Sequence, residues 1–154
     1  MTVWVDGDSC PRPAMEAILV HAGGKGPKIV VAADRDIPGV TAAGATMRVF
    51  ASGAGDVDDF IVSESRAGDL AVTRDYGLGI RLKEAGVTVL NDKGRMWKLS
   101  ELRARAEDAE IMRAVRGGRI AKKQRRSYGK EEAAEFAAAF AALVNGAGRD
   151  GLRG

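Results

Sequence analysis

Two aspartates that lie one residue apart are the first candidates for chemistry in this sequence. Asp6 and Asp8 follow directly after the apolar run of residues 3–5, and Pro11 comes soon afterwards. Two carboxylates this close make each other costlier to ionise unless a cation or a proton compensates. The pair therefore raises the question of what balances its charge.

Further carboxylates follow a second strand pattern and begin a helix pattern. Asp75 comes just after the apolar run of residues 70–73, and Asp58 lies at the start of an amphipathic pattern over residues 57–66. In open α/β sheets, ligands bind beyond the carboxyl ends of the strands. These side chains are therefore candidates for one shared site.

Convergence of several carboxylates predicts a divalent cation. Capping and the helix dipole suffice to explain Asp56 and Asp59 near a helix start. They do not explain several carboxylates at one point, whose repulsion needs a cation. Oxygen ligands without His or Cys favour Mg²⁺ or Mn²⁺, and such sites most often serve phosphodiester or phosphoryl chemistry. The candidate ligands are Asp6, Asp8, Asp58 and Asp75.

The elements that must position these residues alternate between strand and helix patterns. Apolar runs predict strands over residues 3–5, 29–33, 47–51, 70–73 and 87–90. Helical spacing predicts helices over residues 14–21, 57–66, 77–85, 100–116 and 131–144, with Ser100 as an N-cap. Parallel strands need crossover connections, so this alternation predicts an α/β fold with a parallel sheet covered on both faces.

Positive charge is concentrated in one segment. The chain has a net charge of +3, but residues 93–130 hold thirteen Lys or Arg against four Asp or Glu, a local balance of +9. A basic segment beside an acidic body is expected where one part attracts phosphates and another holds cations. Solvated helix faces are the alternative interpretation.

Composition excludes several classes of protein. With 154 residues the chain can form one domain, and no apolar run approaches the length of a membrane span. One Cys and one His are too few for a zinc site. The lone Cys10 and the lack of a signal-peptide pattern predict a cytoplasmic protein that does not enter a membrane.

Three runs of residues, taken in this order, resemble a known family. They are "VDGDSCP" from residue 5, "DVDDFIVSESRAGDLAVTRDYGL" from residue 56 and "GVTVLNDKGR" from residue 86. Together they resemble the YaiI/YqxD family of small bacterial proteins, which is placed among the PIN-like domains. The resemblance covers roughly residues 2–105. It implies a three-layer α/β/α sandwich with a central, mainly parallel sheet, and active PIN-like members are metal-dependent nucleases.

The resemblance also assigns roles to single residues. It implies that Asp6, Asp58 and Asp75 are the catalytic and metal-binding aspartates, and that Asp8 is the family's second acidic position. Thr73 would be a hydroxyl that orients water or substrate, although a strand end also explains a threonine there. The Cys10-Pro11 pair belongs to the same pattern, so we interpret it as a packing and turn feature.

One stretch departs from the family pattern. Where the family commonly has a glycine-rich "T-G-G-P" run, residues 119–130 read "RIAKKQRRSYGK". This departure leaves open whether the substrate is altered or the activity lost. The phosphate contacts that we predict from this stretch are Lys122, Lys123, Arg125 and Arg126.

Two other functions stay open at this point. A haloacid-dehalogenase-type phosphatase also has a D-x-D after an early strand, which Asp6 and Asp8 match. Against it, the acidic "DVDD" run precedes the strand of residues 70–73 instead of following it. The second alternative is a nucleic-acid- or protein-binding module that keeps a PIN-like fold with a partial site.

We therefore predict a PIN-like domain over residues 1–105 that hydrolyses phosphodiesters by metal-activated water. RNA is the expected substrate, and Mg²⁺ or Mn²⁺ the expected cofactor. Residues 106–145 are expected to form a basic and then alanine-rich helical extension, and residues 146–154 a flexible tail. Whether the chain forms a homodimer through its alanine-rich helix is left open, as is whether it is an active enzyme.

Overall fold

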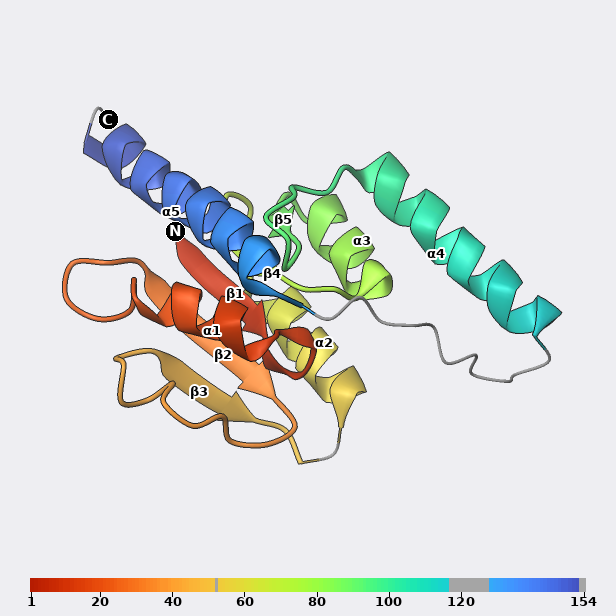
Figure 1. Cartoon of the computed structure of the whole chain (residues 1–154), viewed down its shortest axis with the longest axis horizontal. Coiled ribbons are helices and arrows are strands. Elements are labelled where there is room, and N and C mark those ends of the chain that lie inside the picture. Colours follow the sequence, from red (N-terminus) through yellow and green to blue (C-terminus); the bar gives the residue numbers. More distant parts are fainter. Residues whose placement is uncertain (52, 117–127, 153–154) are drawn as a thin grey trace.

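A parallel sheet lies at the centre of the fold (Figure 1). The computed structural model describes residues 1–51, 53–116 and 128–152. Its strands are β1 (Thr2–Asp6), β2 (Lys28–Ala33), β3 (Thr46–Val49), β4 (Leu70–Val72) and β5 (Thr88–Leu90). They lie in the order β3-β2-β1-β4-β5, and every neighbouring pair is parallel. The predicted α/β class is confirmed.

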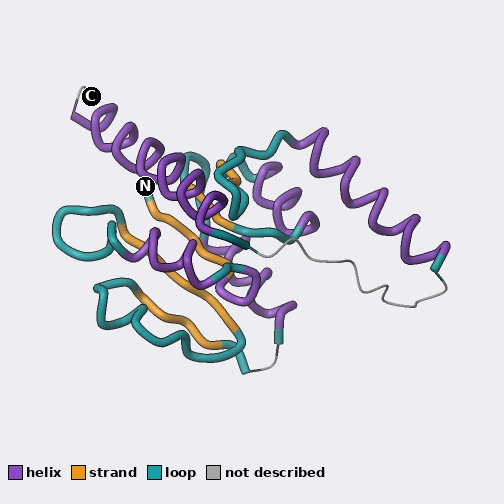
Figure 2. The backbone as a smooth tube through the Cα atoms, viewed as in Figure 1, coloured by secondary structure: helices purple, strands orange, loops and turns teal. Residues whose placement is uncertain are grey.

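Helices cover both faces of this sheet (Figures 1 and 2). Helices α1 (Arg12–Leu19) and α5 (Lys130–Leu152) pack on one face. Helices α2 (Ala54–Glu64) and α3 (Tyr76–Glu84) pack on the other, where the start of α4 (Leu99–Val115) also contacts α3. The result is the three-layer sandwich expected from the sequence.

Strand β1 shows why the central strands are apolar toward both faces of the sheet. Successive side chains of a strand point to opposite faces. Val3 and Val5 pack with α1 and α5, whereas Trp4 between them packs with α2 and α3. Because helices cover both faces of the sheet, the side chains that point to either face must be apolar.

Helix α5 is a layer of the sandwich. Phe136 and Phe140 are fully buried against the sheet, with ring centroids 5.7 Å apart. The helix expected as an extension beyond residue 105 therefore completes the core. It also runs to Leu152, so the predicted helix end at residue 144 is too early. Gly146 weakens a helix without ending it.

The start of α4 also differs from the prediction. Lys98 is the N-cap residue, and Ser100 lies inside the first turn. Serine is compatible with the cap and with the first turn, so composition alone does not fix the exact start of the helix. None of the helices in the described part of the chain is long and apolar enough to cross a membrane.

The chain reverses its winding direction beside β1. Helix α1, between β1 and β2, lies on one face, whereas α2, which leads into β4, lies on the other. The loops after β1 and β4 lead to α1 and α3 on opposite faces and therefore diverge at the carboxyl ends of these neighbouring strands. Open α/β sheets bind ligands in the crevice at such a switch point, and the candidate site lies there.

Candidate functional site

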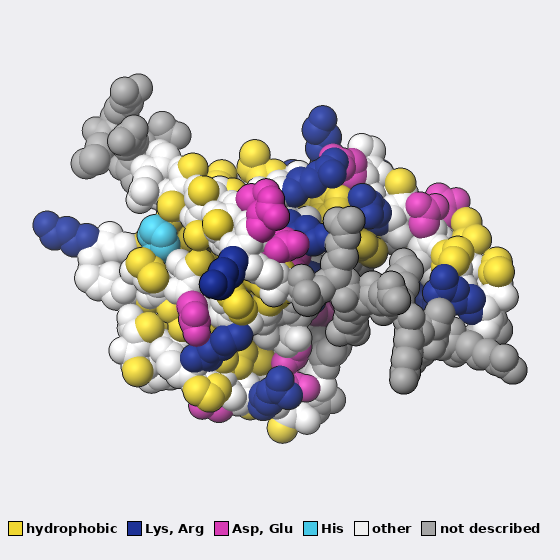
Figure 3. Space-filling model, viewed as in Figure 1, with side chains coloured by type: hydrophobic (Ala, Val, Ile, Leu, Met, Phe, Trp, Pro, Cys, Tyr) yellow, Lys and Arg dark blue, Asp and Glu magenta, His cyan; other side chains and the backbone are white. Residues whose placement is uncertain are grey.

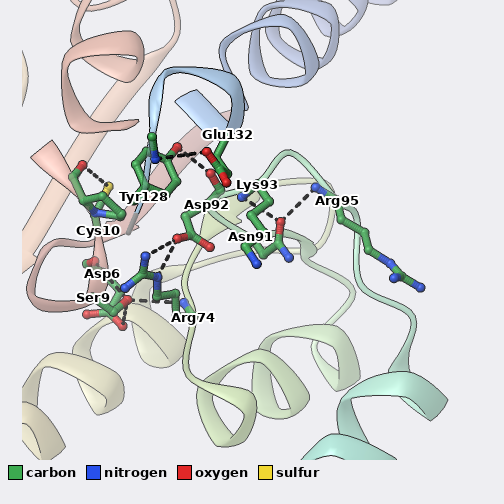
Figure 4. A network of polar contacts seen from close by, with 12 residues as sticks. Asp6, Ser9, Cys10, Arg74, Asn91, Asp92, Lys93, Arg95, Tyr128 and Glu132 are labelled. Carbon is green, nitrogen blue, oxygen red and sulfur yellow. Dashed lines mark hydrogen bonds and ion pairs between the residues drawn. The ribbon is translucent and has the colours of Figure 1, made fainter. Parts of the chain in front are cut away.

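Asp6 is the buried centre of the candidate site. It is the last residue of β1, and 6% of its surface is exposed. The hydroxyls of Ser9 and Thr73 each donate a hydrogen bond to its Oδ2, both at 2.9 Å. Burial raises the pKa of Asp6, and these two hydrogen bonds act against that shift. The carboxylate is therefore held in a fixed orientation (Figure 4).

Thr73 links Asp6 to the start of α3. It directly follows β4, is buried, and accepts a hydrogen bond from the backbone N–H of Asp75 at 3.0 Å through the same hydroxyl that donates to Asp6. The hydroxyl thus connects two of the predicted ligand positions. Its predicted role in orienting water or substrate stays a prediction.

Asp75 caps a helix, which is a common role for an aspartate just before a helix pattern. Its Oδ1 accepts a hydrogen bond from the backbone N–H of Leu78 at 3.0 Å, which satisfies a free donor in the first turn of α3. The side chain is exposed. Capping positions the carboxylate at the crevice next to Thr73.

Asp58 on α2 interacts electrostatically with both other predicted ligands. Burial raises the pKa of Asp58 to about 6, and the negative charges of Asp75 and then Asp6 add to this increase. Arg81 partly opposes it. Asp6, Asp58 and Asp75 therefore lie close enough to disfavour one another's ionised forms.

Asp8 is oriented toward a different element. Both of its carboxylate oxygens accept a hydrogen bond from the backbone N–H of Asp34 at 3.1 Å, which ties the loop after β1 to the end of β2. Burial is the main reason that the pKa of Asp8 is raised, and the nearby charges of Asp34 and Asp6 contribute. Asp8 thus lies at the edge of the site.

The described residues contain no group of three or more His, Cys, Asp or Glu side chains already arranged to hold a metal ion. Asp75 and Asp8 are each oriented by a backbone N–H group, Asp75 through Oδ1 alone and Asp8 through both carboxylate oxygens. The donor set itself fits Mg²⁺ or Mn²⁺, because it consists of carboxylate oxygens. The predicted phosphate contacts at Lys122, Lys123, Arg125 and Arg126 lie outside the described residues.

A second polar network adjoins Asp6 and was not predicted from the sequence (Figure 4). Two guanidinium nitrogens of Arg74 lie 2.5 Å from Oδ2 of Asp92, a carboxylate whose side chain is only 7% exposed. Tyr128 donates its hydroxyl to the backbone oxygen of Asp92 at 2.6 Å. The backbone N–H of Arg74 donates to the hydroxyl of Ser9.

Asp92 could have been found from the sequence. It follows β5 as Asp75 follows β4, and polar residues just after parallel strands are candidates for a site.

Cys10 adjoins this network but is not an activated nucleophile. Burial, followed by the negative charges of Asp92 and Asp6, raises the pKa of its thiol to about 12. The side chain is half-buried and packs against the core next to α1. The interpretation of the Cys10-Pro11 pair as a packing feature agrees with this environment.

Part of the positive charge of the basic segment is locally paired. Arg103 on α4 forms an ion pair with Glu84, and Arg95 pairs with Glu101. On the described surface in Figure 3, Lys and Arg side chains lie among Asp and Glu side chains. The described part of the segment, residues 93–116 and 128–130, is therefore not a uniform basic surface, and its individual cations must be considered separately.

The fold and the site define the class of this protein: a three-layer α/β protein with buried and exposed carboxylates at the switch point of a parallel sheet. The model of the family described as "Uncharacterized BCR, YaiI/YqxD family" matches residues 4–146. The chain belongs to the YaiI/YqxD family. The match extends through α4 and most of α5, which agrees with the place of α5 in the core.

Curated relatives support this assignment. A UPF0178 protein of Aliivibrio fischeri is 33% identical over 120 residues, which are 78% of this chain and 80% of the relative. A UPF0178 protein of Treponema pallidum is 33% identical over 137 residues, covering 89% and 77% of the two chains. One from Pseudomonas putida is 28% identical over 150 residues, covering 94% and 96%. No solved structure matches the chain.

Proposed function

We propose that this protein is a metal-dependent nuclease that hydrolyses phosphodiesters, with RNA as its substrate. Asp6, Asp58 and Asp75 would hold Mg²⁺ or Mn²⁺, with Asp8 assisting. The observation on which the proposal rests is the mutual electrostatic effect of these carboxylates, which contributes to raising the pKa of Asp58 to about 6. A divalent cation would relieve that repulsion.

The residues around Asp6 have separate tasks in this proposal. Ser9 and Thr73 fix the Asp6 carboxylate through hydrogen bonds to one oxygen, so that it need not reorient during binding. Thr73 also connects this carboxylate to the backbone of Asp75. When bound, the divalent cation supplies Lewis acidity for the attack of water on the phosphodiester. The resemblance of these aspartates to the PIN-like pattern supports the same assignment.

A cleavage assay tests the proposal. Labelled single-stranded and structured RNA are incubated with Mn²⁺ and either the wild-type protein, Asp6→Asn or Asp59→Asn. Asp59 is the matched control, because its carboxylate is exposed and forms an ion pair with Arg81. We expect cleavage by the wild type and the control, and a loss of roughly 100-fold or more in Asp6→Asn. Equal cleavage by Asp6→Asn, or none by any of the three, would contradict the proposal.

A non-catalytic nucleic-acid-binding module is the second candidate. It is favoured by the lack, among the described residues, of three side chains already arranged around a metal position. In this case the protein would bind RNA in the absence of metal and leave it intact. Replacing Lys122, Lys123, Arg125 and Arg126 together by neutral residues would make the slope of log affinity against log salt concentration shallower. The change would be about 0.7 for each phosphate contact that is lost.

A cytoplasmic location is part of the proposal. The lone Cys10 is compatible with a reducing compartment, and its thiol pKa of about 12 gives it little tendency to oxidise. RNA substrates are plentiful in that compartment. Fractionation of cells that express the tagged protein would test the prediction.

A further inference from the structure

An open groove of about 1090 Å³ adjoins the acidic site. Asp8 and Ser9 line it where it approaches Asp6, and Lys93, Arg95 and Arg105 line another part of it around Trp97. This volume is at the upper limit of the roughly 300–1,000 Å³ that is usual for small-molecule pockets. The groove therefore suits an extended ligand that spans an acidic part and a basic part.

The basic part of the groove is built on Trp97. The indole is 8% exposed and contacts the edge of Tyr76, with ring centroids 6.1 Å apart. The guanidinium groups of Arg95 and Arg105 each lie 5.5 Å from the centre of the Trp97 ring. One buried aromatic ring thus holds two arginines, one from the turn after β5 and one from α4.

The turn that presents Lys93 and Arg95 is also fixed. The side-chain oxygen of Asn91 accepts the backbone N–H groups of Lys93 at 3.0 Å and Arg95 at 2.9 Å. In Figure 4 the side chain of Arg95 extends away from Asn91, consistent with its ion pair to Glu101. The basic part therefore has a preset backbone, which lowers the entropy cost of binding.

Within the part of the chain that the structure describes, two cations of the groove form no ion pair. They are Lys93 and Arg105, and both are exposed. The lining also includes the carboxylates of Asp8 and Glu135, and the backbone of Glu135 lies close to the turn that carries Lys93. Among the described lining residues, Lys93 and Arg105 are the cations that an anionic ligand can contact without displacing an ion pair.

We propose that this groove binds a single-stranded nucleic acid, with phosphates on one side of the scissile bond held by Lys93 and Arg105. This inference rests on the proposed function, because it takes the acidic part as the place of hydrolysis. Exposed cations beside aromatic side chains are typical of single-strand binding, where unstacked bases leave their faces free. Trp97 is buried beneath its two arginines, so the aromatic side chains that such bases could contact are the half-buried Tyr76 and Tyr128. A duplex keeps its bases stacked and gains nothing from these two rings.

Binding in the absence of metal tests the inference apart from catalysis. A labelled 12-nucleotide RNA is titrated by fluorescence anisotropy in EDTA over a range of salt concentrations, with the full-length protein. The groove variant is Lys93→Ala/Arg105→Ala. The control is Lys98→Ala/Arg103→Ala, which removes the same charges from exposed positions on the same segment that do not line the groove.

We expect the groove variant to bind roughly tenfold more weakly. The slope of log affinity against log salt concentration should become shallower by about 1.4, or about 0.7 for each phosphate that is no longer neutralised. The control should bind within about twofold of the wild type. Equal effects in both variants, or no binding by the wild type, would overturn the inference. So would equal affinity for duplex RNA or equally tight binding of a mononucleotide.

The two proposals fail in different ways. A wild-type protein that shows the groove effect in EDTA but never cleaves RNA would refute the nuclease and support the groove. A protein that cleaves RNA with Mn²⁺, while its groove variant binds like the control, would refute the groove alone. Circular dichroism of both double variants checks that neither has lost its fold.

Discussion

The Thr73 hydroxyl donates to Oδ2 of Asp6 at 2.9 Å although the two residues are 67 positions apart. Their contact follows from the register of the sheet, in which Val5 of β1 lies opposite Val72 of β4. Asp6 and Thr73 come next after Val5 and Val72, so they are also adjacent, and both are buried. The central strands thus bring a carboxylate and a hydroxyl together at the crevice.

Replacing Thr73 by valine should destabilise the protein. The change removes a buried donor to Asp6 and the acceptor for the backbone N–H of Asp75. We expect a loss of about 1–3 kcal/mol in the free energy of unfolding, measured by urea denaturation at pH 7. Thr73→Ser keeps the hydroxyl and should recover most of this loss. Equal destabilisation by both substitutions would show that the methyl group matters and the hydrogen bonds do not.

Asp58→Asn should stabilise the metal-free protein at neutral pH. The folded-state pKa of about 6 exceeds the ordinary value of 3.8, so between these values the native state binds more protons than the unfolded state. The stability contributed by protonated Asp58 is therefore lost as pH rises through this window. Asparagine has no proton to lose and stays neutral, so Asp58→Asn should have a higher Tm than the wild type at pH 7.5. This advantage should disappear below pH 4, where Asp58 is also neutral.

Asp59→Asn serves as the control for this pH profile. Asp59 precedes Phe60 on the same helix, but its exposed carboxylate pairs with Arg81 at 3.0 Å. Its replacement should lower stability at neutral pH, by no more than about 1 kcal/mol. A lower Tm for Asp58→Asn at pH 7.5, as in the control, would contradict the mutual repulsion of Asp58, Asp75 and Asp6.

Gly7→Ala should disturb the loop that carries Asp8 and Ser9. A Cβ at Gly7 would lie 2.6 Å from Cδ1 of Ile37 and 3.0 Å from Cβ of Ala33. We expect a loss of about 1–3 kcal/mol by thermal or urea unfolding, because the end of β2 leaves no room for a methyl group.

Gly55→Ala is the matched control, because nothing lies within 4 Å of a Cβ at that position in α2. It should stabilise the protein by about 0.5–1 kcal/mol, as alanine does in a helix. If Gly7→Ala were equally stabilising, the close contact between the β1 loop and Ile37 would not exist in solution.

Cys10 should react slowly with thiol reagents in the native protein. Its thiol pKa of about 12 leaves little thiolate at pH 8, whereas an ordinary thiol has a pKa of 9.0. Labelling with a chromogenic disulfide should be roughly 100-fold or more slower in the native state than in urea. Native labelling at the unfolded rate would contradict the burial of this side chain.

The sequence predicts the central strands well because they are buried on both faces and therefore mostly apolar, whereas the edge strand β3 includes polar residues and is largely exposed. It also places Asp6 and Asp75 at the same edge, since polar residues after parallel strands converge. It does not reveal which donor each carboxylate accepts, because the hydroxyls of Ser9 and Thr73 are oriented by tertiary contacts. The helix-capping role of Asp75 is by contrast local, because its donor is the N–H of Leu78 three residues on, and an aspartate just before a helix pattern indicates such a cap.

The packing of α5 is detectable in the sequence, although the alanine-rich composition of the helix masks it. Phe136, Phe140 and Val144 are spaced four residues apart, and this stripe is the buried face of the helix. The Arg74–Asp92 ion pair could not be foreseen as a pair, because the partners come from different strand ends. Each residue by itself follows a strand and obeys the same rule as Asp75.

Binding of Mn²⁺ to the metal-free protein, measured by calorimetry, tests the proposed cation site most directly. The wild type and Asp59→Asn should bind the ion with similar affinity, because Asp59 pairs with Arg81 at the surface and contributes least among the neighbouring charges that shift the pKa of Asp58. Asp6→Asn should lose this binding while remaining folded, because the central carboxylate of the site becomes a neutral amide. No binding by the wild type, or undiminished binding by Asp6→Asn, would contradict a metal site at the carboxyl ends of β1 and β4.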